Sequence, residues 1–77
     1  MDISLTDFMV HVDETLEPVE MDRLEDSLRT NACVVSACTS PRDPHLLLVA
    51  FNPECTSSGI ILNQVKSQGV HAELVGL

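Results

Sequence analysis

The segment from His45 to Phe51, HLLLVAF, gives the strongest single indication of how this chain folds. Every residue after the histidine is apolar, so both faces of an extended strand would be apolar here. Such a short run is typical of a central strand that is covered on both sides. Asn52 and Pro53 follow it and end the run, because both residues interrupt a sheet. We therefore expect a sheet with this segment at its centre.

Three further segments are predicted to form strands. Apolar residues alternate with other residues from Phe8 to Val12 and again from Val70 to Leu74, which is the period of a half-buried strand. The segment from Cys33 to Thr39, CVVSACT, is a short run of residues that favour strands. Two prolines and an aspartate between Ser40 and Pro44 predict a turn that joins the second and third strands.

The first predicted helix lies between the first two strands. Met21, Leu24 and Leu28 recur at helical spacing and predict an amphipathic helix over roughly residues 17–30. Pro18 fits the first turn of this helix, where its missing N–H costs little. The apolar stripe should pack on the sheet.

The second predicted helix follows the central strand. Thr56 or Ser57 can cap its first turn, and Gly69 can close it. Ile61 and Val65 are spaced one helical turn apart and should face the core.

The predicted order of elements is β-α-β-β-α-β in a single domain of residues 1–77. Short connections and right-handed crossovers turn this order into an α+β, ferredoxin-like sandwich. Four antiparallel strands in the spatial order 4-1-3-2 should carry both helices on one face. The other face of the sheet should be open.

Negative charge is concentrated at the start of the chain. The first 26 residues hold nine acidic residues and one basic residue, so their formal charge of −8 equals that of the whole chain. Such a field repels nucleic acid and anionic lipid, and it attracts cations or a basic protein partner. The alternative is a surface that only keeps the domain in solution.

We expect a cytoplasmic protein without membrane insertion. No apolar run approaches the roughly 20 residues that span a bilayer, and the first residues do not resemble a secretory signal. Cys33, Cys38 and Cys55 make an odd count with no tight pairing motif. This favours reduced thiols over a disulfide framework, with the cysteines acting as small, partly buried apolar residues.

The order and spacing of several short segments resemble the heavy-metal-associated domain family. That family includes small copper chaperones and the N-terminal modules of metal-pumping P-type ATPases. The resemblance covers about residues 8–76. It rests on four segments: Leu24-Glu25, Val34–Ala37, Val49–Pro53 and Gly69–Val75.

The family's metal-binding motif is changed in this chain. Members of the family bind a soft metal with a Cys-x-x-Cys pair at the end of the first loop. Counting back from Leu24-Glu25 places those two positions at Glu17 and Glu20. Soft ligands select Cu(I), whereas carboxylates suit harder ions. The resemblance therefore implies the metal transport and chaperone class, with a metal transporter as partner, but not copper delivery.

The loop and helix start from Asp13 to Glu20 form the first candidate metal site. Glu17 and Glu20 are three residues apart and share a helix face. They could chelate a divalent cation with help from Asp13 or Glu14. The alternative is structural, because acids in a first turn complement the helix dipole and Glu20 could complete a capping box.

The histidines form the second candidate site. His11 is near the end of the first strand, whereas His45 and His71 open the third and fourth. In the predicted topology all three lie at one end of the sheet, with His11 and His71 close to a cross-strand pair. With Asp13 nearby, they would suit Zn(II), Ni(II) or Co(II). A register slip of one residue would remove this site, leaving ordinary surface histidines.

The open face of the sheet is expected to be apolar enough to form a homodimer or to dock on another protein. Its expected members are Met9, two or three of Leu47, Val49 and Phe51, and also Val75 and Leu77.

Two functions remain open from the sequence. The first is a small divalent-cation-binding domain of the metal transport and chaperone class. The second is a degenerate relative that binds no metal and serves as a protein-interaction or regulatory module. We do not expect an enzyme, because no phosphate loop, nucleophile elbow or Cys–His arrangement of recognisable spacing is present.

Overall fold

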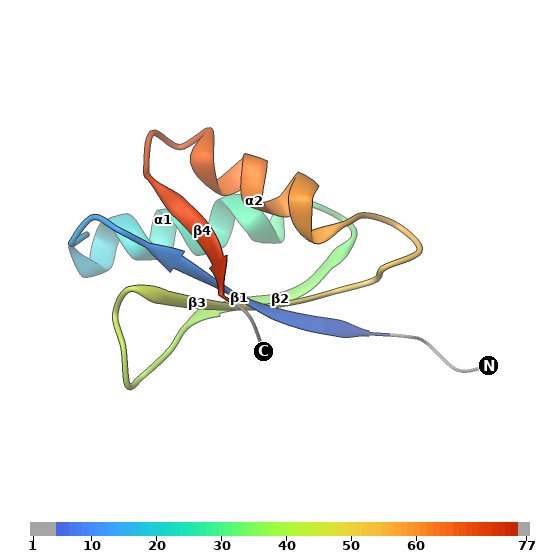
Figure 1. Ribbon diagram of the computed structural model, residues 1–77, viewed down its shortest axis with the longest axis horizontal. Helices are drawn as coiled ribbons and strands as arrows, with labels where there is room; N and C mark the ends of the chain where they lie inside the picture. The colour runs from blue at the N-terminus through green and yellow to red at the C-terminus, as the bar shows by residue number, and fades with distance from the viewer. Residues whose placement is uncertain (1–4, 76–77) are drawn as a thin grey trace.

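The computed structural model describes residues 5–75, and Figure 1 shows the arrangement of their helices and strands. Within this range the elements follow the predicted order β-α-β-β-α-β. Their bounds are β1 Thr6–Val12, α1 Pro18–Arg29, β2 Val34–Thr39, β3 Leu46–Phe51, α2 Ser58–Lys66 and β4 Ala72–Val75.

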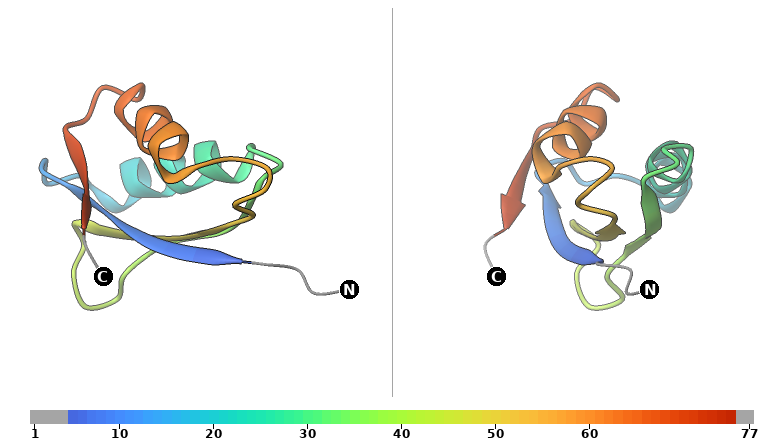
Figure 2. Two further views of the ribbon diagram at one scale, coloured as in Figure 1. Left: turned by 45° about the vertical axis from the view of Figure 1, so that its right-hand side comes forward. Right: turned by 90° about the vertical axis from the view of Figure 1, so that its right-hand side faces the viewer.

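The strands form one antiparallel sheet in the order β2-β3-β1-β4. Both helices lie on the same side of this sheet, and the turn between β2 and β3 projects from the other side (Figure 2). The ferredoxin-like fold predicted from the sequence is therefore confirmed, including the spatial order 4-1-3-2.

The register of the two central strands decides which side chains are buried. β1 pairs with β3 from Thr6 opposite Phe51 to His11 opposite Leu46. Val10 and Val12 are fully buried on the helix side, and Leu47 lies beside Val10 on the same face. The rings of Phe8 and Phe51 meet edge to face with centroids 5.3 Å apart. These residues form the sheet half of the core.

Helix α1 buries its predicted stripe and is tied to β2 by polar contacts. Met21, Leu24 and Leu28 are buried, and Pro18 occupies the first helical position. The carboxylate of Glu25 accepts hydrogen bonds from the backbone N–H of Thr39, at 2.9 Å, and from its hydroxyl. Arg29 donates to the backbone carbonyl of Ala37 at 2.7 Å. These contacts hold the helix on the edge strand.

Helix α2 has the predicted start and end. The Ser57 hydroxyl accepts a hydrogen bond from the Ile60 backbone N–H, at 3.3 Å, as a helix cap does. Ile61 and Val65 are fully buried. Gly69 follows the helix with φ of +89°, a conformation that a residue with a side chain rarely adopts.

The expected membership of the open face is wrong in part. Leu47, Val49 and Phe51 all point toward the helices and are buried. Their neighbours Leu46, Leu48 and Ala50 are only partly buried on the open face, so β3 is covered on one side and not on both. Both alternating sets of β3 side chains are apolar, so either set could be buried. The register with β1 places Leu47, Val49 and Phe51 on the helix side.

Two other expected members of the open face have separate outcomes. Val75 is paired with Met9, and both side chains are on the open side as expected. Leu77 lies outside the described residues.

The cysteines differ from the sequence-based expectation. Cys33 and Cys55 are joined by a disulfide although 22 residues separate them in sequence. Cys38 is a free, exposed thiol on β2. The expectation of three reduced thiols is wrong because the fold brings the start of β2 next to the loop after β3, a juxtaposition that cysteine spacing does not reveal.

No helix within residues 5–75 is both long enough and apolar enough to cross a membrane.

Truncating the core should destabilise this small domain strongly. We expect Leu28→Ala to lower the free energy of unfolding by about 2–5 kcal/mol, because it removes buried methyl groups and leaves a cavity. Urea denaturation followed by circular dichroism measures this loss. The matched control is Val19→Ala on the same helix, where the side chain is 53 % exposed. Its effect should stay within about 0.5 kcal/mol, and an equal loss in both variants would contradict this description of the core.

Candidate metal centre at the end of the sheet

Three potential metal ligands gather where β1 ends and β4 begins. His11, Asp13 and Glu73 each offer one ligand atom, and these atoms all lie within 4.8 Å of one another. We call this group the His11 cluster. It is the one group of three or more such ligands among residues 5–75.

Strand register brings two of the three ligands together. His11 lies opposite Glu73 in the β1–β4 ladder, so both side chains project from the open face. Asp13 follows β1, and its backbone N–H extends the ladder by donating to the His71 carbonyl at 2.8 Å. The His11 Nδ1 atom is 3.1 Å from Asp13 Oδ1. The cluster therefore rests on rigid strand backbone with flexible carboxylates above it.

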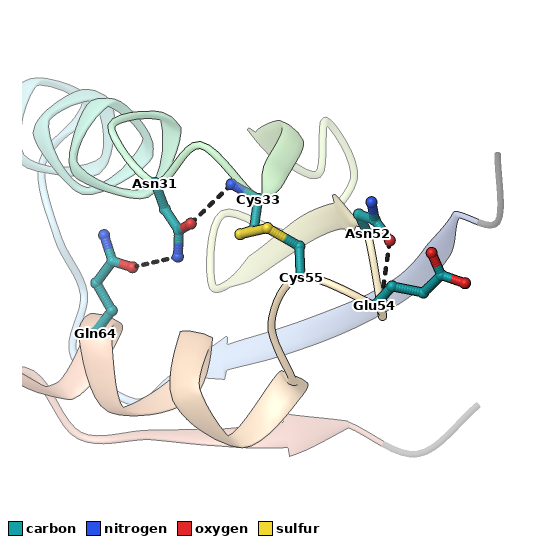
Figure 3. The surroundings of a disulfide bond; sticks show 6 residues. All are labelled: Asn31, Cys33, Asn52, Glu54, Cys55 and Gln64. Carbon is teal, nitrogen blue, oxygen red and sulfur yellow. Dashed lines mark hydrogen bonds between the residues drawn. A yellow bond between two sulfur atoms is a disulfide. The ribbon is translucent and has the colours of Figure 1, made fainter.

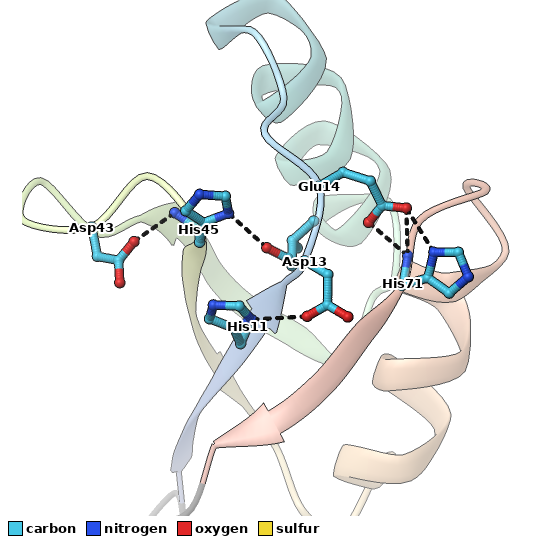
Figure 4. Close-up of polar contacts among 7 residues, drawn as sticks. His11, Asp13, Glu14, Asp43, His45 and His71 are labelled. Carbon is cyan, nitrogen blue, oxygen red and sulfur yellow. Dashed lines mark hydrogen bonds and ion pairs between the residues drawn. The ribbon is translucent and has the colours of Figure 1, made fainter.

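His45 immediately precedes the neighbouring strand β3 and lies against the cluster (Figure 4). Its ring stacks on the ring of His11 with centroids 5.6 Å apart and an angle of 17° between the planes. The Nδ1 atom lies 2.8 Å from the backbone carbonyl oxygen of Val12. Because a carbonyl only accepts, Nδ1 must be the donor in this contact. The stack restricts the rotation of the His11 ring.

His71 does not join the other two histidines. Its ring Nδ1 is 2.9 Å from Glu14 Oε2, and its backbone N–H donates to both oxygens of the same carboxylate at 2.9 and 3.0 Å. Figure 4 shows this pair on the far side of Asp13 from His11. The predicted His11–His71 pair is wrong, because β4 begins at Ala72 and the residue opposite His11 is Glu73.

The contact with His71 changes the acidity of Glu14. The hydrogen bond from the His71 side chain is the main cause that lowers the pKa of Glu14, and the hydrogen bond from the His71 backbone N–H adds to it. Both stabilise the ionised carboxylate. The pair closes the loop after β1 onto the start of β4.

Glu17 and Glu20 are engaged in capping α1. Glu17 is the residue before the first helical position, and its backbone N–H donates to Glu20 Oε1 at 3.2 Å. This is the capping-box role that the sequence left open for Glu20. Both residues are exposed, and the His11 cluster does not include them. Glu17 and Glu20 occupy the two positions where the resembling family has cysteines, and here they take part in the start of α1.

The donor set of the His11 cluster is one imidazole and two carboxylates. Nitrogen and oxygen donors suit Zn(II), Ni(II) or Co(II), and two ligands of a tetrahedral ion stand about 3.3–3.6 Å apart. The 3.1 Å between His11 and Asp13 is close to this spacing, and exposed Glu73 can rotate inward to complete it. A bound cation would replace the proton that His11 and Asp13 share.

Glu73 is the ligand that sequence reasoning missed. It alternates with apolar residues in the last strand, so its exposure was expected. Only the pairing of β4 with β1 shows that it faces His11. Glu73 reaches this position because β4 begins at Ala72, two residues after Val70, where the sequence pattern starts the strand.

No family model matches the chain, and no curated protein matches it.

Solved structures, in contrast, match the fold closely. The copper-binding domain from HMA7, a P-type ATPase, has a TM-score of 0.81 at 18 % identity, over 91 % of this chain and 93 % of that one. The Cu(I)-loaded N-terminal domain of a potential copper-translocating P-type ATPase from Bacillus subtilis has a TM-score of 0.81 at 17 % identity, over 92 % and 88 %. The CopZ metallochaperone has a TM-score of 0.75 at 14 % identity, over 91 % and 100 %.

The chain has the fold of a heavy-metal-associated domain. The resemblance inferred from short sequence segments is therefore confirmed in three dimensions. At these identities the likeness concerns the fold, and the ligands that this chain offers must be judged from its own residues.

The Glu14–His71 contact predicts a pH dependence. The pKa of Glu14 is lowered in the folded state, so the contact stabilises the fold at pH values above the ordinary glutamate range. This contribution is lost as the pH falls through the lowered pKa of Glu14. We expect His71→Ala to move the pKa of Glu14 back toward its ordinary value, because the ring donor is removed. NMR titration of the side-chain carboxyl measures it, and an unchanged pKa would contradict the contact.

Proposed function

We propose that this chain is a divalent-cation-binding domain of the metal transport and chaperone class, with its metal centre at the His11 cluster. The observation that carries the proposal is the convergence of one imidazole and two carboxylates within 4.8 Å at the exposed end of the sheet. The cargo would be a harder ion than Cu(I), with Zn(II), Ni(II) and Co(II) as candidates. The domain would act in the cytoplasm beside a metal transporter.

The position of the cluster supports a transfer role. It lies at the sheet end from which the loop to α1 leaves, and two of its members are exposed. An exposed site with three protein ligands leaves coordination positions open for water or for a ligand from a partner. Such a site binds and releases an ion more readily than a closed site does.

The charge of the chain supports a cationic cargo. The formal charge of −8 arises within the first 26 residues, which include β1, the loop after it and most of α1. Negative potential around the end of β1 raises the local concentration of divalent cations and speeds their association. Copper delivery by the loop pair is disfavoured, because Glu17 and Glu20 offer hard oxygen ligands and the Glu20 carboxylate caps α1.

A metal titration tests this function. Zn(II), Ni(II), Co(II) and Mn(II) are added to the disulfide-bonded protein in a Cys38→Ser background, so that no thiol contributes, and backbone NMR shifts are recorded. We expect shifts centred on His11, Asp13 and Glu73 for at least one of these ions. His11→Ala and Glu73→Gln should each raise the Kd at least about tenfold, because each removes one ligand.

The matched control is His71→Ala, which removes an exposed imidazole near the cluster without removing a ligand. It should leave the affinity of the domain for the metal unchanged. Absence of localised shifts at millimolar concentrations of all four ions would refute the proposal. An equal loss of metal affinity in His71→Ala and His11→Ala would show that the metal does not bind at the His11 cluster.

A second candidate is a protein-interaction module that binds no metal. It is favoured by the outer face of α1, where the 53 % exposed Val19 lies among exposed acids. An apolar residue within an acidic surface fits a basic partner that carries an apolar contact of its own. A homodimer through the open sheet face is the other form of this proposal.

Two measurements separate these forms. Sedimentation equilibrium over a range of protein concentrations should show a growing dimer fraction if the open face associates. If the acidic face of α1 binds a basic partner, a pull-down should lose that partner when Val19→Lys is introduced and keep it with Val35→Lys, a matched change at another exposed valine. A strict monomer that captures no partner would exclude this candidate.

A further inference from the structure

The Cys33–Cys55 pair lies at the opposite end of the sheet from the His11 cluster, because β2 begins opposite the end of β3 whereas His11 is opposite the start of β3. Figure 3 shows the surroundings of the disulfide. Cys33 precedes β2, and Cys55 lies in the loop between β3 and α2. The two Cα atoms are 5.4 Å apart. The spacing of the cysteines in the sequence does not predict this pair, and the fold brings the two residues together.

The backbone holds the two cysteines together without help from the disulfide. The Cys33 carbonyl accepts a hydrogen bond from the Asn52 backbone N–H at 2.9 Å. The Asn52 carbonyl in turn accepts from the Cys55 backbone N–H at 3.0 Å. These two backbone hydrogen bonds do not depend on the S–S bond. Reduction would therefore leave them in place, and the two thiols would stay adjacent.

A side-chain network fixes the same place from the helix side. The Cys33 backbone N–H donates to Asn31 Oδ1 at 2.9 Å, and the Asn31 amide donates to Gln64 Oε1 at 3.3 Å. Gln64 also donates to the Ser27 carbonyl at 2.7 Å. This network links the end of α1 to α2, as Figure 3 shows for Asn31 and Gln64. The cysteine pair therefore sits on a preorganised frame.

Solvent reaches the pair. Cys33 is partly buried and Cys55 is exposed, so a reductant and then an ion can approach the sulfur atoms. Cys55 is two residues before Ser57, the cap of α2, and the first turn of α2 contains no acid. The positive end of this helix is thus free to favour negative thiolates nearby.

We propose that Cys33 and Cys55 form a redox-gated, two-thiolate site for a soft monovalent ion of the Cu(I) class. A dithiol reductant opens the site by giving two electrons and two protons to the disulfide, and it becomes a disulfide itself. The ion then displaces one proton from each thiol and forms two metal–sulfur bonds. A disulfide oxidant of the glutathione type then takes two electrons and two protons and becomes two thiols, the Cys33–Cys55 bond forms again, and the monovalent ion leaves with its charge unchanged.

The ligand set determines the class of ion. Thiolates select soft ions, and two of them satisfy an ion that accepts two ligands, whereas structural Zn(II) requires four. Metal–sulfur bonds of about 2.3 Å place two thiolates on one ion up to about 4.6 Å apart. Rotation about the two Cα–Cβ bonds reaches this span when the Cα atoms are 5.4 Å apart.

This site is independent of the function proposed for the His11 cluster. The two sites lie at opposite ends of the sheet and differ in donor type, so either can exist without the other. Their tests also use different ions and different oxidation states of the protein.

A chelator competition tests the proposal. The protein is reduced with a phosphine, desalted without oxygen, and titrated against Cu(I) held by a chromophoric chelator. We expect the reduced protein to withdraw one equivalent of Cu(I) and the oxidised protein to withdraw none. Cys33→Ser and Cys55→Ser should each bind Cu(I) at least about 100-fold more weakly, because chelation by the second thiolate is lost.

Cys38→Ser is the matched control, since it removes the free thiol on β2 and leaves the pair intact. It should retain the full affinity for Cu(I), and so should His11→Ala. Circular dichroism of the reduced protein and of the Cys33→Ser/Cys55→Ser variant verifies that both remain folded.

Two outcomes would overturn the proposal. One is equal Cu(I) uptake by the reduced protein and by the folded Cys33→Ser/Cys55→Ser variant, which would place the copper elsewhere. The other is reduced protein that is folded yet withdraws no Cu(I).

Discussion

The antiparallel pairing of β1 with β3 is the interaction on which the rest of the structure depends. Thr6 lies opposite Phe51 and His11 opposite Leu46, so one alternating set of apolar residues in each central strand points to the helices. A shift by one residue would turn every side chain of one strand to the other face. Both helices pack on the apolar surface that this register makes, where Leu28, Ile61 and Val65 are fully buried.

The same register makes the chemistry at the two ends of the sheet different. At one end it presents His11, with the ring of His45 stacked on it and Glu73 opposite, which is a nitrogen and oxygen environment. At the other end the start of β2 and the loop after β3 bring Cys33 and Cys55 together, which is a sulfur environment. The loop that holds copper in the resembling family has no thiol here, and the carboxylate of Glu20 caps α1. The same fold therefore presents candidate ligands at different places in this chain.

Much of the fold was predictable because its signals are local. The helical stripe of Met21, Leu24 and Leu28, the Ser57 cap and the turn at Gly69 depend on residues a few positions apart. The site was less predictable. His11 and Asp13 were chosen correctly as neighbours, since they are two residues apart at the end of β1. His71 was paired with His11 wrongly, and Glu73 was missed, because the start of β4 shifts the pairing by two residues.

The sequence by itself determined the order of strands and helices, the faces that β1 and α1 bury, and the location of the negative charge. These follow from periodicity and composition, which act within a few residues. Only the tertiary structure decided which half of the apolar β3 run is buried, which carboxylate faces His11, and that Cys33 meets Cys55. The physical reason is that these contacts join residues far apart in sequence, and several registers satisfy the local preferences equally well.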